Sequence, residues 1–312
     1  MNLSRKFKGL LNRLISQGHW YNESKFRGCR KFWTYKTFNT EIVNLGSTSG
    51  VNAFCYDDIP HKCANWALES NPLKGDLAIL RNYYSYLSEN ASTVILTLCP
   101  FSSLSGGYDI TEDRYYSLLY PSSIPLYSIC RQQQIKKEVN NPLCCYPVIA
   151  IFTDLKALIK GKRKCSLTET QMQADAKNWI TNWMKEFSII DFSYPLSMVN
   201  CDGIEEAAKI INEVVTFCKE RNIRPVLAIP PVYHTLGEMF TPEIRKKVID
   251  SLIERIDDKY VWYHNYMDDP EFTNDISLFQ NSYLMNRKGA KLFTHRVLMD
   301  IGLVNDGKTE LV

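Results

Sequence analysis

From Glu41 onward, short apolar runs alternate with longer segments in which apolar residues recur at helical spacing. Four runs have the length of strands and are apolar on both faces, as in parallel strands that helices cover on both sides. They lie at residues 42–45, 93–98, 226–229 and 260–263, and residues 148–152 form a weaker fifth candidate. These runs predict the strands of a mainly parallel sheet.

Helical periodicity fills the intervals between these runs. In residues 204–220 the apolar positions fall on one face, and Asp202-Gly203 is a plausible cap. Thr241 followed by Pro242 predicts the start of a helix that continues to about residue 256. Further helices are predicted at residues 76–88, 168–187 and 286–301. The alternation predicts an α/β fold, a doubly wound sheet between helices in three layers, as in flavodoxin-like proteins.

Two parts of the chain depart from this alternation. Residues 1–40 precede it and are interpreted as a basic N-terminal arm or helix. Residues 106–163 are rich in Tyr, Pro, Ser and basic residues, and are interpreted as an insertion or lid over the carboxyl edge of the sheet. The prediction is therefore a single domain at residues 41–303, interrupted by that insertion and followed by a tail at residues 304–312.

Composition narrows the class of protein. Hydrophobic content of 45% and charged content of 23% over 312 residues are ordinary for a globular protein, and a net charge of +3 gives no reason to expect a nucleic-acid partner. The ten cysteines are scattered without a Cys-x-x-Cys pair, so we expect reduced thiols, no metal site and no cofactor. With no bilayer-length apolar stretch and no secretory signal, the expected location is the cytoplasm.

Residues 1–31 have a charge pattern of their own. Eight basic residues stand against a single acid, Glu23, and apolar residues recur at helical spacing among them (Leu3, Phe7, Leu10, Leu11 and Leu14). A basic amphipathic segment can lie on an anionic membrane, which would place the protein at the inner face of the membrane. The alternative is an ordinary helix docked on the domain with its basic face in water.

Candidate chemistry lies directly after the first predicted strand. The apolar run ends at Gly46, and Ser47, Thr48 and Ser49 follow before Gly50. In a parallel sheet this position is the carboxyl edge, where ligands bind and the next helix offers free N–H groups. A hydroxyl there is a candidate nucleophile, with the Gly46–Gly50 turn as a candidate oxyanion site. The alternative is that these residues only cap the next helix.

Two blocks of the sequence resemble the SGNH/GDSL hydrolase superfamily. Ile42-Val-Asn-Leu-Gly-Ser-Thr-Ser49 resembles its strand–Gly-x-Ser block, and residues 279–293, which include Asn281 and Leu284, resemble its closing Asp-x-x-His block. The likeness is to the branch that contains the D-alanine transfer protein of teichoic acids and alginate-type O-acetyltransferases. It implies an SGNH-like fold and a glycan-ester substrate of bacterial surface-polysaccharide metabolism.

The chain departs from that family at the residues that do the chemistry. Thr48 stands at the position of the nucleophilic serine, Asn281 at that of the acid, and Leu284 at that of the base. A replacement base is sought among the five histidines, and His234 is the best candidate because it follows Pro230-Pro231 at the carboxyl end of a predicted core strand.

Other polar and aromatic groups have two interpretations each. Asp57-Asp58 and Asp268-Asp269 suggest a divalent metal, but such pairs are more often turn residues or caps. Tyrosines that recur in two stretches are either a sugar-stacking platform or ordinary packing residues: Tyr83, Tyr84, Tyr86, Tyr115, Tyr116 and Tyr120.

Two hypotheses about function remain open. The first is an esterase or acyltransferase that uses Ser47 or Ser49 with His234, and with Gly46, Gly50 and Asn281 around the oxyanion. The second is a catalytically silent SGNH-like protein that binds a saccharide or a partner protein. The retained hydroxyls favour the first hypothesis, and the missing acid and base favour the second.

Overall fold

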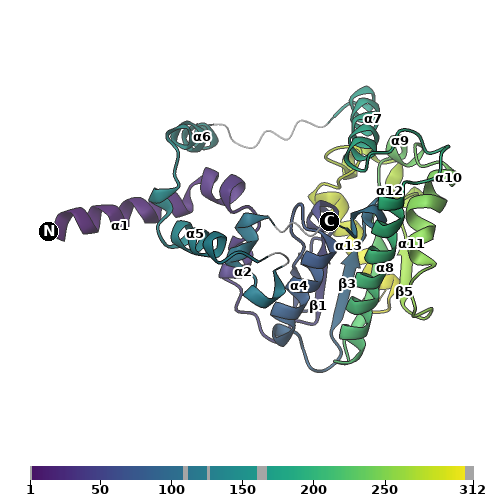
Figure 1. Ribbon diagram of the computed structural model, residues 1–312, viewed down its shortest axis with the longest axis horizontal. Helices are drawn as coiled ribbons and strands as arrows, with labels where there is room; N and C mark the ends of the chain where they lie inside the picture. The colour runs from purple at the N-terminus through teal and green to yellow at the C-terminus, as the bar shows by residue number, and fades with distance from the viewer. Residues whose placement is uncertain (1, 108–111, 125–126, 160–166, 306–312) are drawn as a thin grey trace. The chain divides into compact units, whose positions relative to one another are not determined.

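A computed structural model describes residues 2–107, 112–124, 127–159 and 167–305. The chain divides into two compact units, Met1–Thr37 with Asp109–Cys165 and Phe38–Tyr108 with Ser166–Val312 (Figure 1). We call them the helical unit and the sheet unit. Most of the predicted tail, together with residues 108–111, 125–126 and 160–163 of the predicted insertion, lies outside the described residues.

The sheet unit has an α/β fold, as the alternation predicted. Its five strands are all parallel and lie in the order β2-β1-β3-β4-β5. They are β1 (Ile42–Gly46), β2 (Cys63–Asn65), β3 (Thr93–Thr97), β4 (Arg224–Ile229) and β5 (Trp262–Asn265). The register pairs Gly46 with Thr97, and Leu96 with Leu227. The carboxyl ends of β1, β3 and β4 therefore meet at one edge of the sheet.

Helices cover both faces of the sheet. The α-helices of the sheet unit are α3 (Thr48–Ala53), α4 (Leu73–Tyr83), α7 (Glu169–Glu186), α8 (Met198–Lys219), α9 (His234–Gly237), α10 (Pro242–Arg245), α11 (Ser251–Ile253), α12 (Pro270–Thr273) and α13 (Arg287–Asp300). α4 and α8 contact each other on one face, and α3 and α13 contact each other on the opposite face. This arrangement explains why every residue of β1 and β3 is buried.

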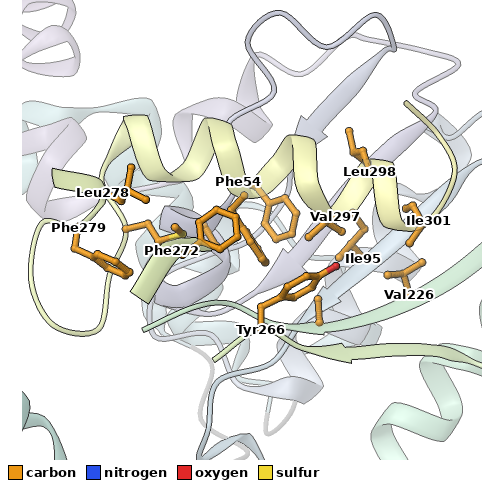
Figure 2. Close-up of a cluster of buried hydrophobic side chains, with 14 of the residues drawn as sticks. Phe54, Ile95, Val226, Tyr266, Phe272, Leu278, Phe279, Val297, Leu298 and Ile301 are labelled. Carbon is orange, nitrogen blue, oxygen red and sulfur yellow. The ribbon is translucent and has the colours of Figure 1, made fainter. Parts of the chain in front are cut away.

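The core between α13 and the sheet is a continuous apolar cluster. Phe293, Val297 and Leu298 of α13 pack with Ile95 of β3 and Val226 of β4, all of them at most 1% exposed (Figure 2). Burying one such side chain contributes about 1.5–3 kcal/mol. The cluster therefore anchors α13, and with it the loop that precedes α13, over the sheet.

The helical unit contains no strand among its described residues. Its α-helices are α1 (Asn2–Gln17), α2 (Arg30–Trp33), α5 (Ile129–Asn140) and α6 (Val148–Ile159). The prediction of a strand at residues 148–152 is wrong, because these residues form the first part of α6. A short apolar run by itself does not distinguish a strand from a buried helix segment.

Element boundaries also differ from the predictions. The predicted strand at residues 260–263 lies two residues later, because a turn at Asp258, whose carboxylate accepts from Tyr260 N–H, delays pairing until Trp262. β2 was not predicted, since its sequence Cys-Ala-Asn has no β-branched or aromatic residue. α8 begins at Met198 and is capped by Ser197, not by Asp202. The predicted cap at Thr241, with Pro242 in the first turn, is confirmed.

No helix among the described residues is long and apolar enough to cross a membrane.

Candidate functional site

The strand order reverses between β1 and β3, since β2 lies on one side of this pair and β4 and β5 on the other. In open α/β sheets ligands bind at such a switch point, outside the carboxyl ends of the strands. Gly46 ends β1 there with a φ of +131°, and a Cβ at this position would lie 2.6 Å from the carbonyl oxygen of Thr97. Only glycine fits this close approach of two strands.

The predicted hydroxyl cluster lies at this switch point, but its members differ in exposure. Ser47 precedes α3, and Thr48 is its first residue; both are partly exposed. Ser49 is only 4% exposed, and its Oγ makes no hydrogen bond of ordinary geometry with the described residues. Ser47 does not cap α3 through its side chain, so the hydroxyls are not explained as caps.

The space beside Ser49 is almost completely filled. The cavity there has a volume of about 10 Å³, enough for a single water molecule. Its walls include Ser49, Leu98, Pro100, Tyr283 and Leu284. The hydroxyl of Tyr283 lies beside Ser49 and Cys99, and burial raises the pKa of Tyr283 well above its usual value. Tyr283 is therefore a neutral phenol at physiological pH and cannot accept a proton from Ser49.

Helix α7 holds Tyr283 in place. The rings of Trp179 and Trp183 lie 4.8 Å and 5.0 Å from that of Tyr283, between centroids. Asp175 accepts hydrogen bonds from the backbone N–H and the hydroxyl of Ser282, at 3.0 Å and 2.6 Å. The predicted helix at residues 168–187 thus forms, and it fastens the loop that closes the cavity. The spacing of the tryptophans predicted the helix, but it did not predict that the helix holds the loop that closes the cavity.

Asn281 and Leu284 are parts of this closing loop. Asn281 Oδ1 accepts from the backbone N–H groups of Tyr283 and Leu284, at 3.1 Å and 2.7 Å. The side chain therefore shapes a turn, and its oxygen is already occupied. Leu284 lines the cavity, so the position that resembles the family's base presents an aliphatic side chain to Ser49.

His234 lies at the start of α9, after the carboxyl end of β4, as predicted. Its Nε2 is 3.3 Å from Glu169 Oε1, and its Nδ1 is 3.3 Å from Glu238 Oε1. Within the described part of the chain, these two carboxylates are its polar partners. The neighbouring Tyr233 donates a hydrogen bond to the second oxygen of Glu169. The structure therefore groups His234 with Glu169, Glu238 and Tyr233, and not with the hydroxyls of Ser47, Thr48 and Ser49.

The two glycines proposed around the oxyanion have internal partners. The N–H of Gly46 donates to Asp76 Oδ1 at 3.1 Å. The carbonyl of Gly50 accepts from the side-chain amides of Asn44 and Asn65, at 3.0 Å and 3.1 Å. A Cβ on Gly50 would also lie 2.9 Å from the Cβ of Ala67. Close packing explains both glycines.

Asp76 is a residue that the sequence analysis missed as part of this site. It is buried in α4, where Oδ1 accepts from Gly46 and from Asn71 Nδ2, the latter at 2.7 Å. Burial raises the pKa of Asp76 to about 7, and these two donors only partly oppose that shift. The feature of the sequence that could have indicated Asp76 is that it is the only acid within the apolar helix pattern of residues 73–83.

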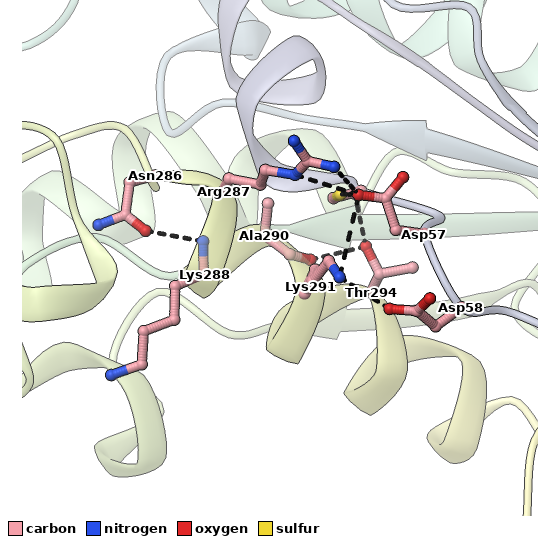
Figure 3. Close-up of polar contacts among 9 residues, drawn as sticks. Asp57, Asp58, Asn286, Arg287, Lys288, Ala290, Lys291 and Thr294 are labelled. Atoms are coloured by element: carbon pink, nitrogen blue, oxygen red, sulfur yellow. Dashed lines mark hydrogen bonds and ion pairs between the residues drawn. The ribbon is translucent and has the colours of Figure 1, made fainter. Parts of the chain in front are cut away.

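The paired acids are bound to cations. Asp57 accepts from Arg287, and Asp58 accepts from Lys291 at 2.7 Å, so both tie the loop after α3 to α13 (Figure 3). Asp268 pairs with Arg245. In the part of the chain that the structure describes, no three His, Cys, Asp or Glu side chains are grouped to hold a metal ion.

The tyrosines considered for sugar stacking lie in both units. Tyr83, Tyr84 and Tyr86 belong to the sheet unit, and Tyr115, Tyr116 and Tyr120 belong to the helical unit. Tyr115 and Tyr116 are buried, which favours the packing interpretation for these two.

Comparisons with known proteins add no family to this description. No protein-family model matches the chain, and no curated protein matches it in sequence.

Proposed function

We propose that this chain is a catalytically silent, SGNH-like protein of bacterial surface-polysaccharide metabolism, which acts by binding a saccharide or a partner protein. The observation that carries the proposal is the closed cavity beside Ser49, walled by Tyr283 and Leu284. The resemblance of residues 42–49 and 279–293 supplies the metabolic context. We place the protein in the cytoplasm, with the basic residues 1–31 at the inner face of the membrane.

The size of the cavity argues against ester chemistry at Ser49. Pockets for small molecules usually measure about 300–1,000 Å³. The space beside Ser49 measures about 10 Å³, which does not admit an acyl group. A nucleophilic hydroxyl also needs a base within hydrogen-bond reach, and Leu284 and the neutral Tyr283 offer none.

A second candidate function is ester hydrolysis or acyl transfer by Ser47. One arrangement favours it: His234 lies 3.3 Å from Glu169, and a carboxylate beside an imidazole can orient it as a general base. Ser47 also retains partial exposure at the sheet edge. This function requires the α9 segment to bring His234 to its hydroxyl when substrate binds.

Hydrolysis of aryl acetates by the purified full-length chain separates the two functions. The silent protein is expected to release phenol no faster than buffer, and the double variant Ser47→Ala/Ser49→Ala is expected to give the same rate. Ser122→Ala, at an exposed serine of the helical unit, is the matched control. A wild-type rate above buffer that Ser47→Ala/Ser49→Ala and His234→Ala both abolish, and that Ser122→Ala leaves unchanged, would establish the hydrolase instead.

A further inference from the structure

Helix α6 is amphipathic, but its acidic residue faces the unit and its large apolar side chains face outward. Ala150 is completely buried, and Asp154 is turned toward the unit, where it accepts from Trp20 N–H at 2.6 Å and from the hydroxyl of Tyr146 at 2.7 Å. The opposite face carries Val148 and Phe152, which are 75% and 67% exposed. Ile149, Ile151 and Leu155 extend this exposed apolar face. Side chains of this kind are normally buried, so the face calls for an external partner.

Helix α1 presents a second exposed apolar stripe in the same unit. Phe7, Leu10 and Leu14 lie on one side of the helix and are between 53% and 60% exposed. Its sequence contains four basic residues and no acid. Lys6 and Arg13 flank the stripe at helical spacing, and both are exposed.

Within the helical unit, α1 contacts the segment that leads into α6, and the segment after α1 contacts α6 itself. Asn12 of α1 accepts from the backbone N–H of Leu143, and the bond from Trp20 to Asp154 joins the segment after α1 to α6. The rings of Trp20 and Tyr146 also meet edge to face, 5.4 Å apart. These contacts hold α1 and α6 in one compact unit.

We propose that α1 and α6 together dock the protein on an anionic lipid bilayer, with the apolar face of α6 inserted among the headgroups. Interfacial helices combine an apolar face with basic flanks in this way. The acid of α6, Asp154, faces inward, and Lys156 lies on the exposed side. The outward charge of both helices is therefore cationic, which complements the anionic lipid headgroups.

At the α1 stripe, charge also favours a bilayer over a second copy of the chain. If two copies buried their α1 stripes against each other, Lys6 and Arg13 of one would lie near the same residues of the other, and these like charges would repel. A bilayer offers both an apolar layer for Phe152 and negative charge for the basic residues. This inference is independent of whether the sheet edge is silent, because vesicle binding and ester hydrolysis are measured separately.

The test is cosedimentation of the full-length protein with vesicles of phosphatidylglycerol and phosphatidylcholine in equal parts. We expect binding that weakens on raising the salt concentration and on replacing these vesicles with pure phosphatidylcholine. Val148→Ser/Phe152→Ser is expected to weaken binding at least about tenfold, since both remove inserted apolar surface. Lys6→Glu/Arg13→Glu is also expected to weaken it about tenfold or more, through lost attraction to the lipid charge.

The matched control is Ile190→Ser/Tyr260→Ser, at two apolar residues of the sheet unit that are even more exposed than those of α6. It is expected to bind vesicles like the wild type. Hydrogen exchange should show protection of α1 and α6 on vesicle addition, which a misfolded variant cannot imitate. Vesicle binding that survives Val148→Ser/Phe152→Ser would overturn the role of α6, as would a wild-type dimer in solution that this double variant dissociates.

Discussion

The carboxyl edge of the sheet unit and the outer face of α6 are unusual in opposite ways: the first buries polar groups, and the second exposes apolar ones. At the sheet edge, the polar side chains of Ser49 and Asp76 are buried, and Gly46, Asp76 and Asn281 are bonded to the protein itself. On α6, apolar groups that usually lie inside face outward, with Val148 and Phe152 more than half exposed. Apart from the Ser49 hydroxyl, these polar groups at the sheet edge have partners within the protein, whereas the apolar side chains on the outer face of α6 are exposed.

This difference teaches where to look for function in this chain. Of the hydroxyl residues predicted as the site, Ser49 lies beside a space that holds one water molecule, and Ser47 and Thr48 are partly exposed. The run at residues 148–152, which was predicted as a weaker strand candidate, instead forms the start of α6 and exposes most of its apolar side chains. An unsatisfied surface is stronger support for binding than a cluster of reactive residue types.

The largest expected effect tests whether the sheet edge is truly packed like a core. Tyr283→Ala removes a buried ring that contacts Trp179 and Trp183, and we expect it to lower the free energy of unfolding by about 3–5 kcal/mol. Phe152→Ala on α6 is expected to change it by less than about 0.5 kcal/mol, because that ring is exposed. Urea denaturation measures both. If the two variants lost similar amounts of unfolding free energy, the sheet edge would not be packed more tightly than the outer face of α6.

The next largest effect is on stability and comes from replacing a glycine with alanine in each unit. We expect the change to have opposite signs in the two units. Gly46→Ala places a Cβ against the backbone of Thr97 at a positive φ, so we expect a loss of stability of about 2–3 kcal/mol. Gly9→Ala in α1 meets nothing within 4 Å, so we expect it to stabilise the helix by about 0.5–1 kcal/mol. Thermal denaturation checks the first, and hydrogen exchange of α1 checks the second. A stable Gly46→Ala protein would mean that the strands can separate at the switch point.

The smallest effect, when it is counted per unit of pH, concerns the charge of Asp76. Its pKa in the folded protein is raised to about 7, whereas an unfolded aspartate has a pKa near 4. The folded state therefore holds this proton between about pH 4 and pH 7, and stability is lost as pH rises through that window. Relative to Asp76→Asn, the wild type should lose about 1 kcal/mol per pH unit there.

A second aspartate, Asp57, is the control for the direction of this pH dependence of stability. Arg287 holds the pKa of Asp57 below its usual range, so its contribution is present above about pH 4 and is lost as pH falls. Asp57→Asn should therefore change the pH profile of unfolding in the direction opposite to Asp76→Asn. If the stability of both variants depends on pH as that of the wild type does, the folded protein does not retain the Asp76 proton. Asp76 is then ionised, and the closed edge contains a buried charge.

Much of the sheet unit was predictable from local pattern. Continuous apolar runs located β1, β3 and β4, because a parallel strand buried on both faces leaves that signature in the sequence. Thr241 and Pro242 located α10, because capping depends on neighbouring residues alone. β2 and the identity of α6 were not predictable in this way, since short segments take their conformation from the surface against which they pack.

The sequence by itself determined the alternation of strands and helices, the hydroxyls after β1 and the basic character of residues 1–31, since each follows from residue type and spacing. Only the tertiary structure decided that Tyr283 and α7 close the space beside Ser49, that Asp76 binds Gly46, and that α6 turns its apolar face outward. The physical reason is that closure, burial and exposure depend on residues far apart in the chain, such as Ser49 and Tyr283, which only folding brings together.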